Sequence, residues 1–186
     1  MRKDFGAKTW LYPMPVFIVA SYDKNGEACC MNAAWGGIYD DNQIMVCISQ
    51  GHKTTKNILE SKAFTVSVAD AKHIVEADYV GIVSANDVPD KVEKAGLHAV
   101  KSELVNAPLF EEFPFSLECR LVSYDTESEL AVGEIVNVSA DERILDENGN
   151  IDLTKMNPLT YDAVHHVYRG LGEVLGYAFK DGAKLK

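Results

Sequence analysis

Apolar residues near the N-terminus follow the pattern of a β-hairpin. Two apolar runs between residues 16 and 35 flank the sequence Asp23-Lys24-Asn25-Gly26. An Asn-Gly pair between two such runs is among the strongest short hairpin signals. A third apolar run, residues 43–49, follows a turn-like segment at residues 39–42. The pattern therefore predicts that three antiparallel strands open the domain.

Three segments have the spacing or the boundary residues of short helices. Residues 53–61 are rich in helix formers. Residues 71–83 place apolar side chains at roughly helical intervals after Asp70, which suits the N-cap position. Residues 88–96 begin near a proline and end on a glycine, as helices often do. We therefore expect short helices in all three places.

The second half of the chain contains a further hairpin. Residues 115–124 and 129–140 both have strand-like patterns, and the polar segment 125–128 joins them. Residues 64–68 and a short run near 99–105 are also strand-like. Strands in groups, with a few helices and no regular βαβ alternation, indicate a mainly β fold, either an antiparallel barrel or a sandwich with helical insertions. A Rossmann fold is disfavoured.

Length and charge narrow the classes of function. A chain of 186 residues is most simply one domain, residues 1–186, with a sizeable core. Eighteen Lys and Arg against 28 Asp and Glu give a net charge of −10, which argues against binding nucleic acid or an anionic membrane. The N-terminus lacks the apolar core of a secretory signal, and no run approaches the length of a membrane span. We expect a cytoplasmic protein.

The cysteines and histidines do not form a metal-binding pattern. The four cysteines, Cys29, Cys30, Cys47 and Cys119, include no CxxC motif, and we interpret them as free thiols in a reducing compartment. The adjacent pair His165 and His166 has no third ligand at a suitable spacing. No metal site is predicted.

One segment has the chemistry of an anion site. In CISQGHKTTKNILES, residues 47–61, an apolar run ends in glycine, lysine and two threonines before a predicted helix. The first amides of a helix have no partners within the helix, and Gly51 permits close approach of a ligand. An ordinary strand-to-helix turn with threonine caps explains the same residues equally well, so the segment alone leaves both readings open. It lacks the GxxxxGK[ST] pattern of a nucleoside-triphosphate loop.

A second segment suits a flat ligand. Residues 31–37, MNAAWGG, are small or apolar, with one amide and one indole. Small side chains expose backbone groups to the edge of a planar ring, although a core strand with a packed tryptophan fits the same residues. Neighbouring strands can bring residues 32–35 beside residues 49–55. Together the two segments fit one ligand with a planar head and a phosphate tail.

Four segments, in order, resemble the flavin reductase-like, FMN-binding split-barrel family. They are PVFIVASYDKNGEACCMNAAWGG, ISQGHKTTKNILESKAFTVSV, ADYVGIVSANDVPDKVEKAGL and PLFEEFPFSLECRLV. The resemblance runs from about residue 13 to residue 134, with a weaker echo at residues 171–179. It implies a six-stranded antiparallel split β-barrel of Greek-key type with a few short helices. It also implies a homodimer that binds FMN non-covalently near the dimer interface.

The resemblance also implies which residues contact FMN. Beside the isoalloxazine ring and the ribityl chain it places Asn32, Ala33, Ala34 and Trp35. Facing the ribityl and phosphate groups it places Ser49, Gln50, His52, Lys53, Thr54 and Thr55. Gly81 matches a family glycine close to the flavin, and Lys91 lies in a DK motif. The family often has arginine where this chain has His52, which is only partly protonated near neutral pH.

By this resemblance, the chain is expected to be an FMN-dependent oxidoreductase. NADH or NADPH would donate electrons, and free flavin, ferric iron or a partner protein would accept them. Because the cofactor carries this chemistry, no catalytic acid-base residue is assigned. The alternative is a non-enzymatic, flavoredoxin-like electron carrier with bound FMN, since no GxGxxG fingerprint requires a nicotinamide site. A barrel that has lost FMN is a third reading.

Overall fold

The computed structural model describes residues 1–185, and a curled antiparallel sheet forms its centre. The sheet has seven strands in the order β3-β2-β6-β9-β10-β5-β4. Their bounds are β2 (Phe17–Tyr22), β3 (Ala28–Ala33), β4 (Gly36–Asp40), β5 (Gln43–Cys47), β6 (Ala63–Val68), β9 (Phe115–Asp125) and β10 (Leu130–Ala140).

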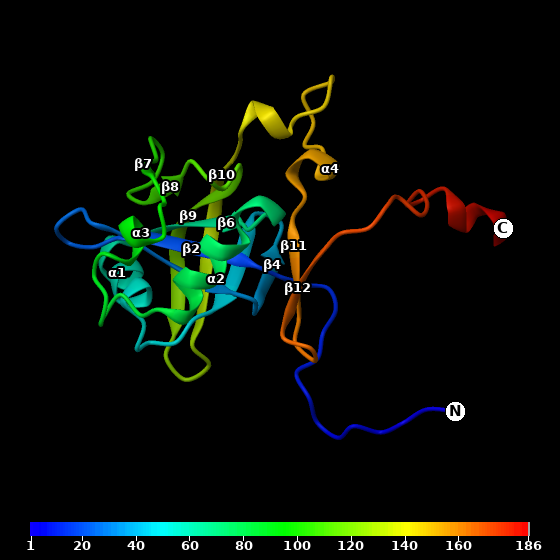
Figure 1. Cartoon of the computed structure of the whole chain (residues 1–186), viewed down its shortest axis with the longest axis horizontal. Helices are drawn as coiled ribbons and strands as arrows, with labels where there is room; N and C mark the ends of the chain where they lie inside the picture. Colours follow the sequence, from blue (N-terminus) through cyan, green and yellow to red (C-terminus); the bar gives the residue numbers. More distant parts are fainter. Residues whose placement is uncertain (186) are drawn as a thin grey trace.

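The sheet curls because its two edge strands are consecutive along the chain. Only Ala34 and Trp35 separate β3 from β4, yet these strands lie at opposite edges of the strand order. A linker this short spans roughly 10 Å at most, so the two edges meet at this corner (Figure 1). With β3 and β4 counted as one bent strand, the sheet is the predicted six-stranded split barrel. The predicted mainly β fold is confirmed.

The predicted hairpins are present, and the third opening strand pairs elsewhere in the sheet. β2 pairs with β3, and β9 pairs with β10, both antiparallel. The third opening strand, β5, does not extend this first hairpin; it pairs with β10 and β4. β4 itself was not predicted, because Gly36 and Gly37 are unfavourable inside strands. An edge position tolerates them, since only one neighbour must be paired.

Within residues 1–185, four short helices accompany the curled sheet. They are α1 (Lys53–Ser61), α2 (Ile74–Ile82), α3 (Lys91–Lys94) and α4 (Leu153–Met156), with 3-10 turns η1 (Ala71–His73), η2 (Glu142–Ile144) and η3 (Asp181–Leu185). The Asp70 carboxylate accepts hydrogen bonds from the N–H groups of Lys72 and His73, as expected of the predicted cap. α3 is shorter than the predicted segment 88–96.

Strand β2 separates two apolar clusters. Ile18 and Ala20 pack with Val80 of α2, whereas Val19 packs with Phe64 inside the curl of the sheet. Alternate residues of a strand face opposite sides, so a strand buried on both sides has a continuous apolar sequence. This packing holds α2 against β3, where the candidate site lies.

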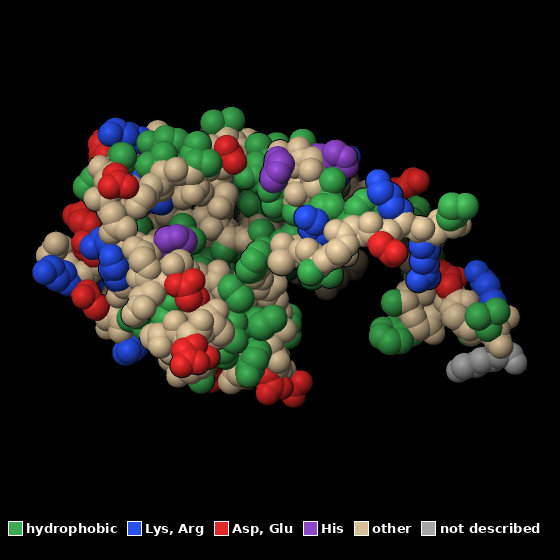
Figure 2. Space-filling model, turned by 90° about the horizontal axis from the view of Figure 1, so that it is seen from below, with side chains coloured by type: hydrophobic (Ala, Val, Ile, Leu, Met, Phe, Trp, Pro, Cys, Tyr) green, Lys and Arg blue, Asp and Glu red, His purple; other side chains and the backbone are tan. Residues whose placement is uncertain are grey.

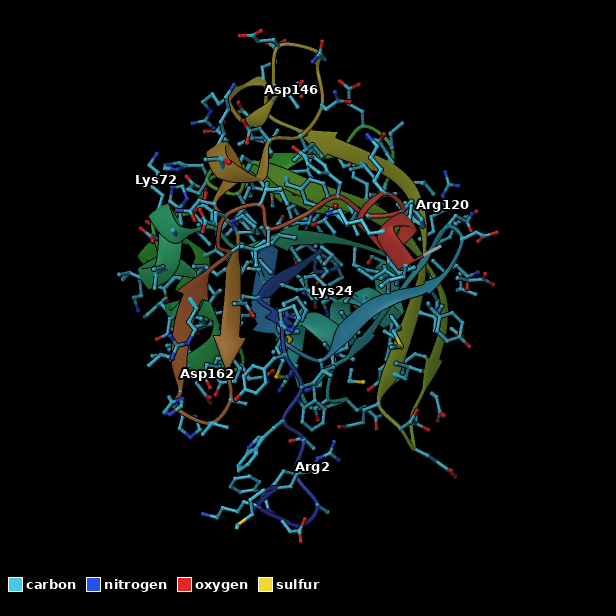
Figure 3. All side chains as sticks on the ribbon, turned by 90° about the vertical axis from the view of Figure 1, so that its right-hand side faces the viewer. Arg2, Lys24, Lys72, Arg120, Asp146 and Asp162 are labelled. Atoms are coloured by element: carbon cyan, nitrogen blue, oxygen red, sulfur yellow. The ribbon has the colours of Figure 1, made fainter. Side chains whose placement is uncertain are left out.

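A small second sheet stands beside the curled one. β1 (Met14–Pro15), β11 (Leu159–Asp162) and β12 (Val167–Gly170) form it, and β7 (Ala99–Lys101) pairs separately with β8 (Pro108–Phe110). Beyond the small sheet, both chain ends extend away from the body on the same side (Figure 1). Figure 3 shows Arg2 on the N-terminal extension and Asp162 at the small sheet. We refer to residues 171–185 as the C-terminal arm.

Among residues 1–185, no helix is long and apolar enough to cross a membrane. The four cysteines are free thiols, of which Cys29, Cys30 and Cys119 are buried. Burial raises the pKa of the Cys119 thiol to about 12.

Candidate functional site

A cavity of about 140 Å³ lies at the N-terminal end of α1. It is lined by Met31 of β3, by residues 52–54, by residues 80–85 at the end of α2, and by Lys91 of α3. The fold therefore gathers five of the predicted cofactor residues around one space, namely His52, Lys53, Thr54, Gly81 and Lys91.

The start of α1 has the electrostatics of an anion site. Within residues 1–185, the backbone N–H groups of Lys53, Thr54 and Thr55 have no hydrogen-bond acceptor, and the first helical bond runs from Lys56 N to His52 O. No acidic residue lies in the first turn, and the N-cap side chain makes no capping bond. Free amides and the positive end of the helix dipole favour a negative group here.

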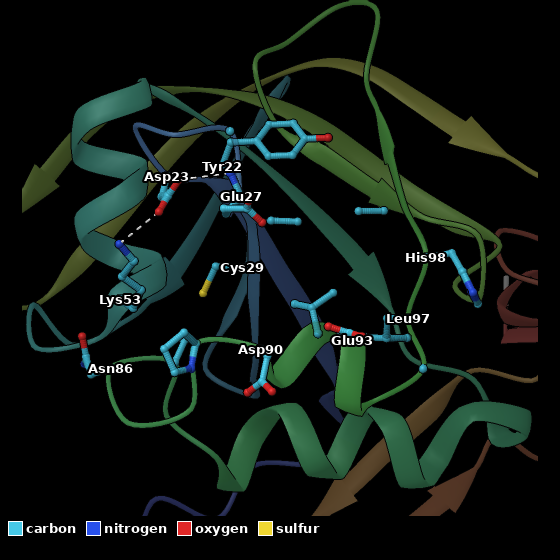
Figure 4. Close-up of a pocket in the computed structure, with 17 residues that line it drawn as sticks. Tyr22, Asp23, Glu27, Cys29, Lys53, Asn86, Asp90, Glu93, Leu97 and His98 are labelled. Atoms are coloured by element: carbon cyan, nitrogen blue, oxygen red, sulfur yellow. Dashed lines mark hydrogen bonds and ion pairs between the residues drawn. The ribbon is translucent and has the colours of Figure 1, made fainter.

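Lys53 and Thr54 supply further donors at this point. The Lys53 ammonium lies 3.5 Å from the Asp23 carboxylate, at the edge of a larger open cavity of about 930 Å³ (Figure 4). The Thr54 hydroxyl is buried and lies 3.3 Å from the Cys29 sulfur. Lys91 lines the 140 Å³ cavity as well, so an anion there would meet two lysines in addition to the helix amides.

Thr55 faces away from this cavity. Its side chain is fully buried, and its hydroxyl oxygen has no hydrogen-bond partner within residues 1–185. An oxygen with no accessible surface is out of reach of a ligand unless the helix moves. The structure thus brings the backbone of Thr55 to the candidate site but not its hydroxyl.

His52 lies on the exposed rim. Its ring nitrogen Nδ1 is 3.2 Å from the sulfur of Met31. Because a thioether can only accept, this contact favours the tautomer with the proton on Nδ1. In this neutral tautomer the other ring nitrogen is an acceptor, so it offers no proton to an anion.

Ser49 and Gln50 are already bonded to a residue that the sequence analysis missed. The Ser49 hydroxyl and the Gln50 N–H both donate to Glu129 Oε1, at 2.8 and 3.0 Å. The bond from Ser49, followed by that from Gln50 and the nearby His52, holds the pKa of Glu129 below its usual value. Glu129 is about 80 residues away along the chain, and no local motif points to it.

The predicted ring-binding residues lie along β3 and the corner after it. The Asn32 amide donates to Ala77 O of α2 at 3.1 Å, so β3 and α2 are joined at this point. Ala33 and Ala34 are half-buried, and Trp35 is 55% exposed. The segment thus presents a small-residue surface bordered by an accessible indole.

Gly81 is required by the close contact between α2 and β3. A Cβ atom at this position would lie 2.2 Å from Nδ2 of Asn32. Only glycine lets the helix approach the Asn32 amide so closely. The matched glycine therefore has a physical reason to be there.

Lys91 is buried, and its charge already has two acceptors. Its Nζ donates to Val80 O at 2.9 Å and to Val83 O at 2.8 Å, the last carbonyls of α2. A cation at this end of a helix is favourable. Burial nevertheless lowers the pKa of Lys91. The ammonium caps α2 and lines the cavity at once.

Tyr168 of β12 also borders this region and has no signal in the sequence. Its hydroxyl donates to the Asp78 carboxylate of α2 at 2.7 Å. Burial, followed by this carboxylate, raises the pKa of Tyr168 far above its usual value. The phenol thus remains protonated and ties the small sheet to α2.

The fold is thus a curled antiparallel β-barrel with a candidate anion site at a helix start and a small-residue strand edge. Residues 9–170 match the family model described as flavin reductase like domain. The chain belongs to this family, which confirms the resemblance seen in the sequence.

Solved structures agree with this assignment. Flavoredoxin of Desulfovibrio vulgaris (Miyazaki F) is 36% identical, with a TM-score of 0.93 over 98% of this chain and 100% of that chain. Flavoredoxin from Methanosarcina acetivorans is 28% identical, with a TM-score of 0.90 over the whole of both chains. Nitrilotriacetate monooxygenase component B from Bacillus cereus is 24% identical, with a TM-score of 0.76 over 90% of this chain and 88% of that one, and shows the shared fold.

Proposed function

We propose that this protein binds FMN non-covalently, with the phosphate at the start of α1. The observation that carries this proposal is the set of three unbonded amides in the first turn of α1, beside Lys53 and Thr54, in a chain of the flavin reductase like family. A phosphate accepts several hydrogen bonds at once, so it matches a helix start that offers three N–H donors. The residues present therefore fit this part of the cofactor.

The size of the cavity indicates where the flavin ring would lie. At about 140 Å³ the cavity holds several water-sized groups, but it is well below the roughly 300–1,000 Å³ of sites that enclose a whole drug-sized ligand. The phosphate and part of the ribityl chain would fill it. The ring would extend along Asn32, Ala33 and Ala34 toward Trp35, where the surface is open.

We propose that the bound cofactor serves an oxidoreductase that uses reduced nicotinamide. FMN would supply the capacity to accept electrons from NADH or NADPH and to pass them to free flavin, ferric iron or a protein. The residues of this chain bind and orient: α1 and Lys53 neutralise the phosphate, while Asn32 and Gly81 hold β3 against α2. No side chain needs to act as an acid or base.

An electron carrier is the second candidate, and one observation favours it. The two flavoredoxins match this chain over essentially its whole length, with TM-scores of 0.93 and 0.90. In a carrier, FMN would stay bound while electrons pass between proteins. A partner protein would then replace nicotinamide as the electron donor.

We also propose that the protein is a homodimer. A ring that extends out of the 140 Å³ cavity would be open to water in a single chain, and exposed Trp35, Ile38 and Tyr39 lie at the same corner of the sheet. The C-terminal arm exposes more apolar side chains and projects away from its own body (Figure 2). A second copy would cover such surfaces.

Two experiments test these proposals: identification of the bound cofactor and an assay of nicotinamide oxidation. The purified protein should be yellow, with a flavin spectrum, and mass spectrometry of the released ligand should identify FMN. Steady-state oxidation of NADH and NADPH, with free flavin or ferric iron as acceptor, then separates the two candidates. If the FMN-loaded protein oxidises neither nucleotide with any acceptor, the reductase is rejected and the carrier is retained. If no flavin binds at micromolar concentration, the proposal of FMN binding fails.

A further inference from the structure

Glu129 joins the turn of the β9–β10 hairpin to the loop that leads into α1. We call residues 48–52 the α1 entry loop. One oxygen of Glu129 accepts both the Ser49 hydroxyl, at 2.8 Å, and the Gln50 N–H, at 3.0 Å. Two donors that the sequence analysis assigned to the cofactor are thus bonded within the protein.

Hydrogen bonds to backbone groups also hold the α1 entry loop in place. Ile48 N donates to Glu129 O at 2.9 Å, and the Tyr124 hydroxyl donates to Ile48 O at 2.9 Å. On the other side of the entry loop, the Asn86 amide donates to Gly51 O at 3.1 Å. The entry loop is therefore held from both sides, directly before the free amides of α1.

We propose that Glu129 is a positioning residue for the cofactor phosphate. Its carboxylate orders the entry loop, so that the first turn of α1 presents its amides to the 140 Å³ cavity before the ligand arrives. Ser49 and Gln50 then act through Glu129 and not by touching FMN. The proposal rests on the function proposed above and adds the residue that arranges that site.

The chemistry of the contact predicts which substitutions preserve it. Both hydrogen bonds end on a single acceptor oxygen, which glutamine retains and alanine removes. The opposing role for Glu129 is electrostatic repulsion, because a carboxylate near a phosphate repels it and weakens binding. In that case both substitutions would tighten FMN binding, so the two roles predict opposite signs.

FMN titration of the flavin-free protein, followed by fluorescence, measures the effect. Glu129→Ala should weaken FMN binding about tenfold, as expected for the loss of the acceptor of both hydrogen bonds to the entry loop. Glu129→Gln should stay within about twofold of the parent protein. Glu127→Ala is the matched control, since Glu127 is an exposed acid in the same turn, and it should leave binding unchanged. Unchanged or tighter binding by Glu129→Ala, or equal weakening by Glu129→Gln, overturns the proposal.

A second measurement does not depend on FMN. Hydrogen exchange of the Gln50 amide in the flavin-free protein should be about tenfold faster in Glu129→Ala than in the parent, and close to the parent in Glu129→Gln. Unchanged exchange would show that the carboxylate does not order the loop. If the parent itself binds no FMN, the proposed function fails, and the exchange result alone decides whether Glu129 holds the loop.

Discussion

Gly81 of α2 lies directly against the side-chain amide of Asn32 on β3. A Cβ atom on Gly81 would sit 2.2 Å from Nδ2 of Asn32, while that same nitrogen donates to Ala77 O at 3.1 Å. Helix α2 and strand β3 therefore meet at the edge of the candidate site with the Asn32 amide packed directly against the helix backbone. The contact fixes the direction of the Asn32 amide relative to the surface proposed for the flavin.

Gly81→Ala should weaken FMN binding while leaving the fold intact. The new methyl group must displace Asn32, and overpacking of this kind costs about 1–3 kcal/mol. Alanine favours a helix over glycine by roughly 1 kcal/mol, so part of the loss in stability is offset. FMN titration together with thermal unfolding separates the two effects. Gly182→Ala, where a Cβ meets nothing within 4 Å, is the control. Parent-like FMN binding by Gly81→Ala would contradict the proposed place of the ring.

Thr54 and Thr55 provide a matched pair of substitutions. Thr54→Val removes the hydroxyl of a residue that lines the cavity, so FMN binding should weaken about fivefold to tenfold. Thr55→Val removes a buried hydroxyl that has no partner within residues 1–185, so FMN binding should not change. The free energy of unfolding should then rise by about 1 kcal/mol, since an unsatisfied polar group is removed. If Thr55→Val weakens FMN binding more than Thr54→Val does, the phosphate lies on the other face of α1.

Asp23→Asn should tighten FMN binding slightly. The substitution weakens the ion pair that holds Lys53, 3.5 Å away, and a partly exposed pair of this kind contributes about 1 kcal/mol, or about fivefold. The asparagine oxygen can still accept the turn bonds from Asn25 N and Glu27 N. Asp146→Asn is the control, because Asp146 accepts two similar turn bonds far from α1 (Figure 3). Weaker binding by Asp23→Asn would show that Asp23 orients Lys53 and does not compete for it.

Local chemistry was sufficient to predict much of the fold. The Asn25-Gly26 turn, the Asp70 cap and the alternation in residues 115–124 each depend on neighbours a few positions away, and each feature is present in the structure. Strand β4 was missed for the same reason, since Gly36 and Gly37 indicate a turn when only local propensity is considered. Its place is set by pairing with β5, such as Gly36 with Val46.

The parts of the site that were missed depend on long-range contacts. Glu129 meets Ser49 only because β10 pairs with β5, which brings Leu130 opposite Cys47. Tyr168 of the small sheet bonds to Asp78 of α2, 90 residues away along the chain. No periodicity or motif records such pairings in one sequence. The family resemblance named residues in segments that line the cavity, but the direction of each side chain in residues 54–55 required the structure.

Stability in acid should depend on Asp162. Its carboxylate accepts hydrogen bonds from His165, at 2.9 Å, from Tyr12, at 3.0 Å, and from Arg169, at 3.2 Å. The bond from His165, and then that from Tyr12, holds the pKa of Asp162 far below its usual value of 3.8. The stabilisation is therefore complete above this usual value and is lost as pH falls below it. Asp162→Asn should lower the melting temperature at pH 7 but flatten its decline between pH 5 and about pH 2. An equally steep decline in the variant would assign acid sensitivity to other groups.

The C-terminal arm should be required for the proposed dimer. Val174, Leu175 and Tyr177 are 81%, 91% and 67% exposed, and the arm leaves the body on the side opposite the helices α1 and α3 (Figure 1). Apolar side chains in such a position gain free energy only when another surface covers them. Light scattering with size-exclusion chromatography should show a dimer for the parent and a monomer for the double variant Leu175→Ser with Tyr177→Ser. Lys180→Ser, a change at an exposed polar position of the same arm, should remain dimeric. A parent that is monomeric at tens of micromolar would reject the dimer, whereas a dimeric double variant would move the interface to the corner that exposes Trp35.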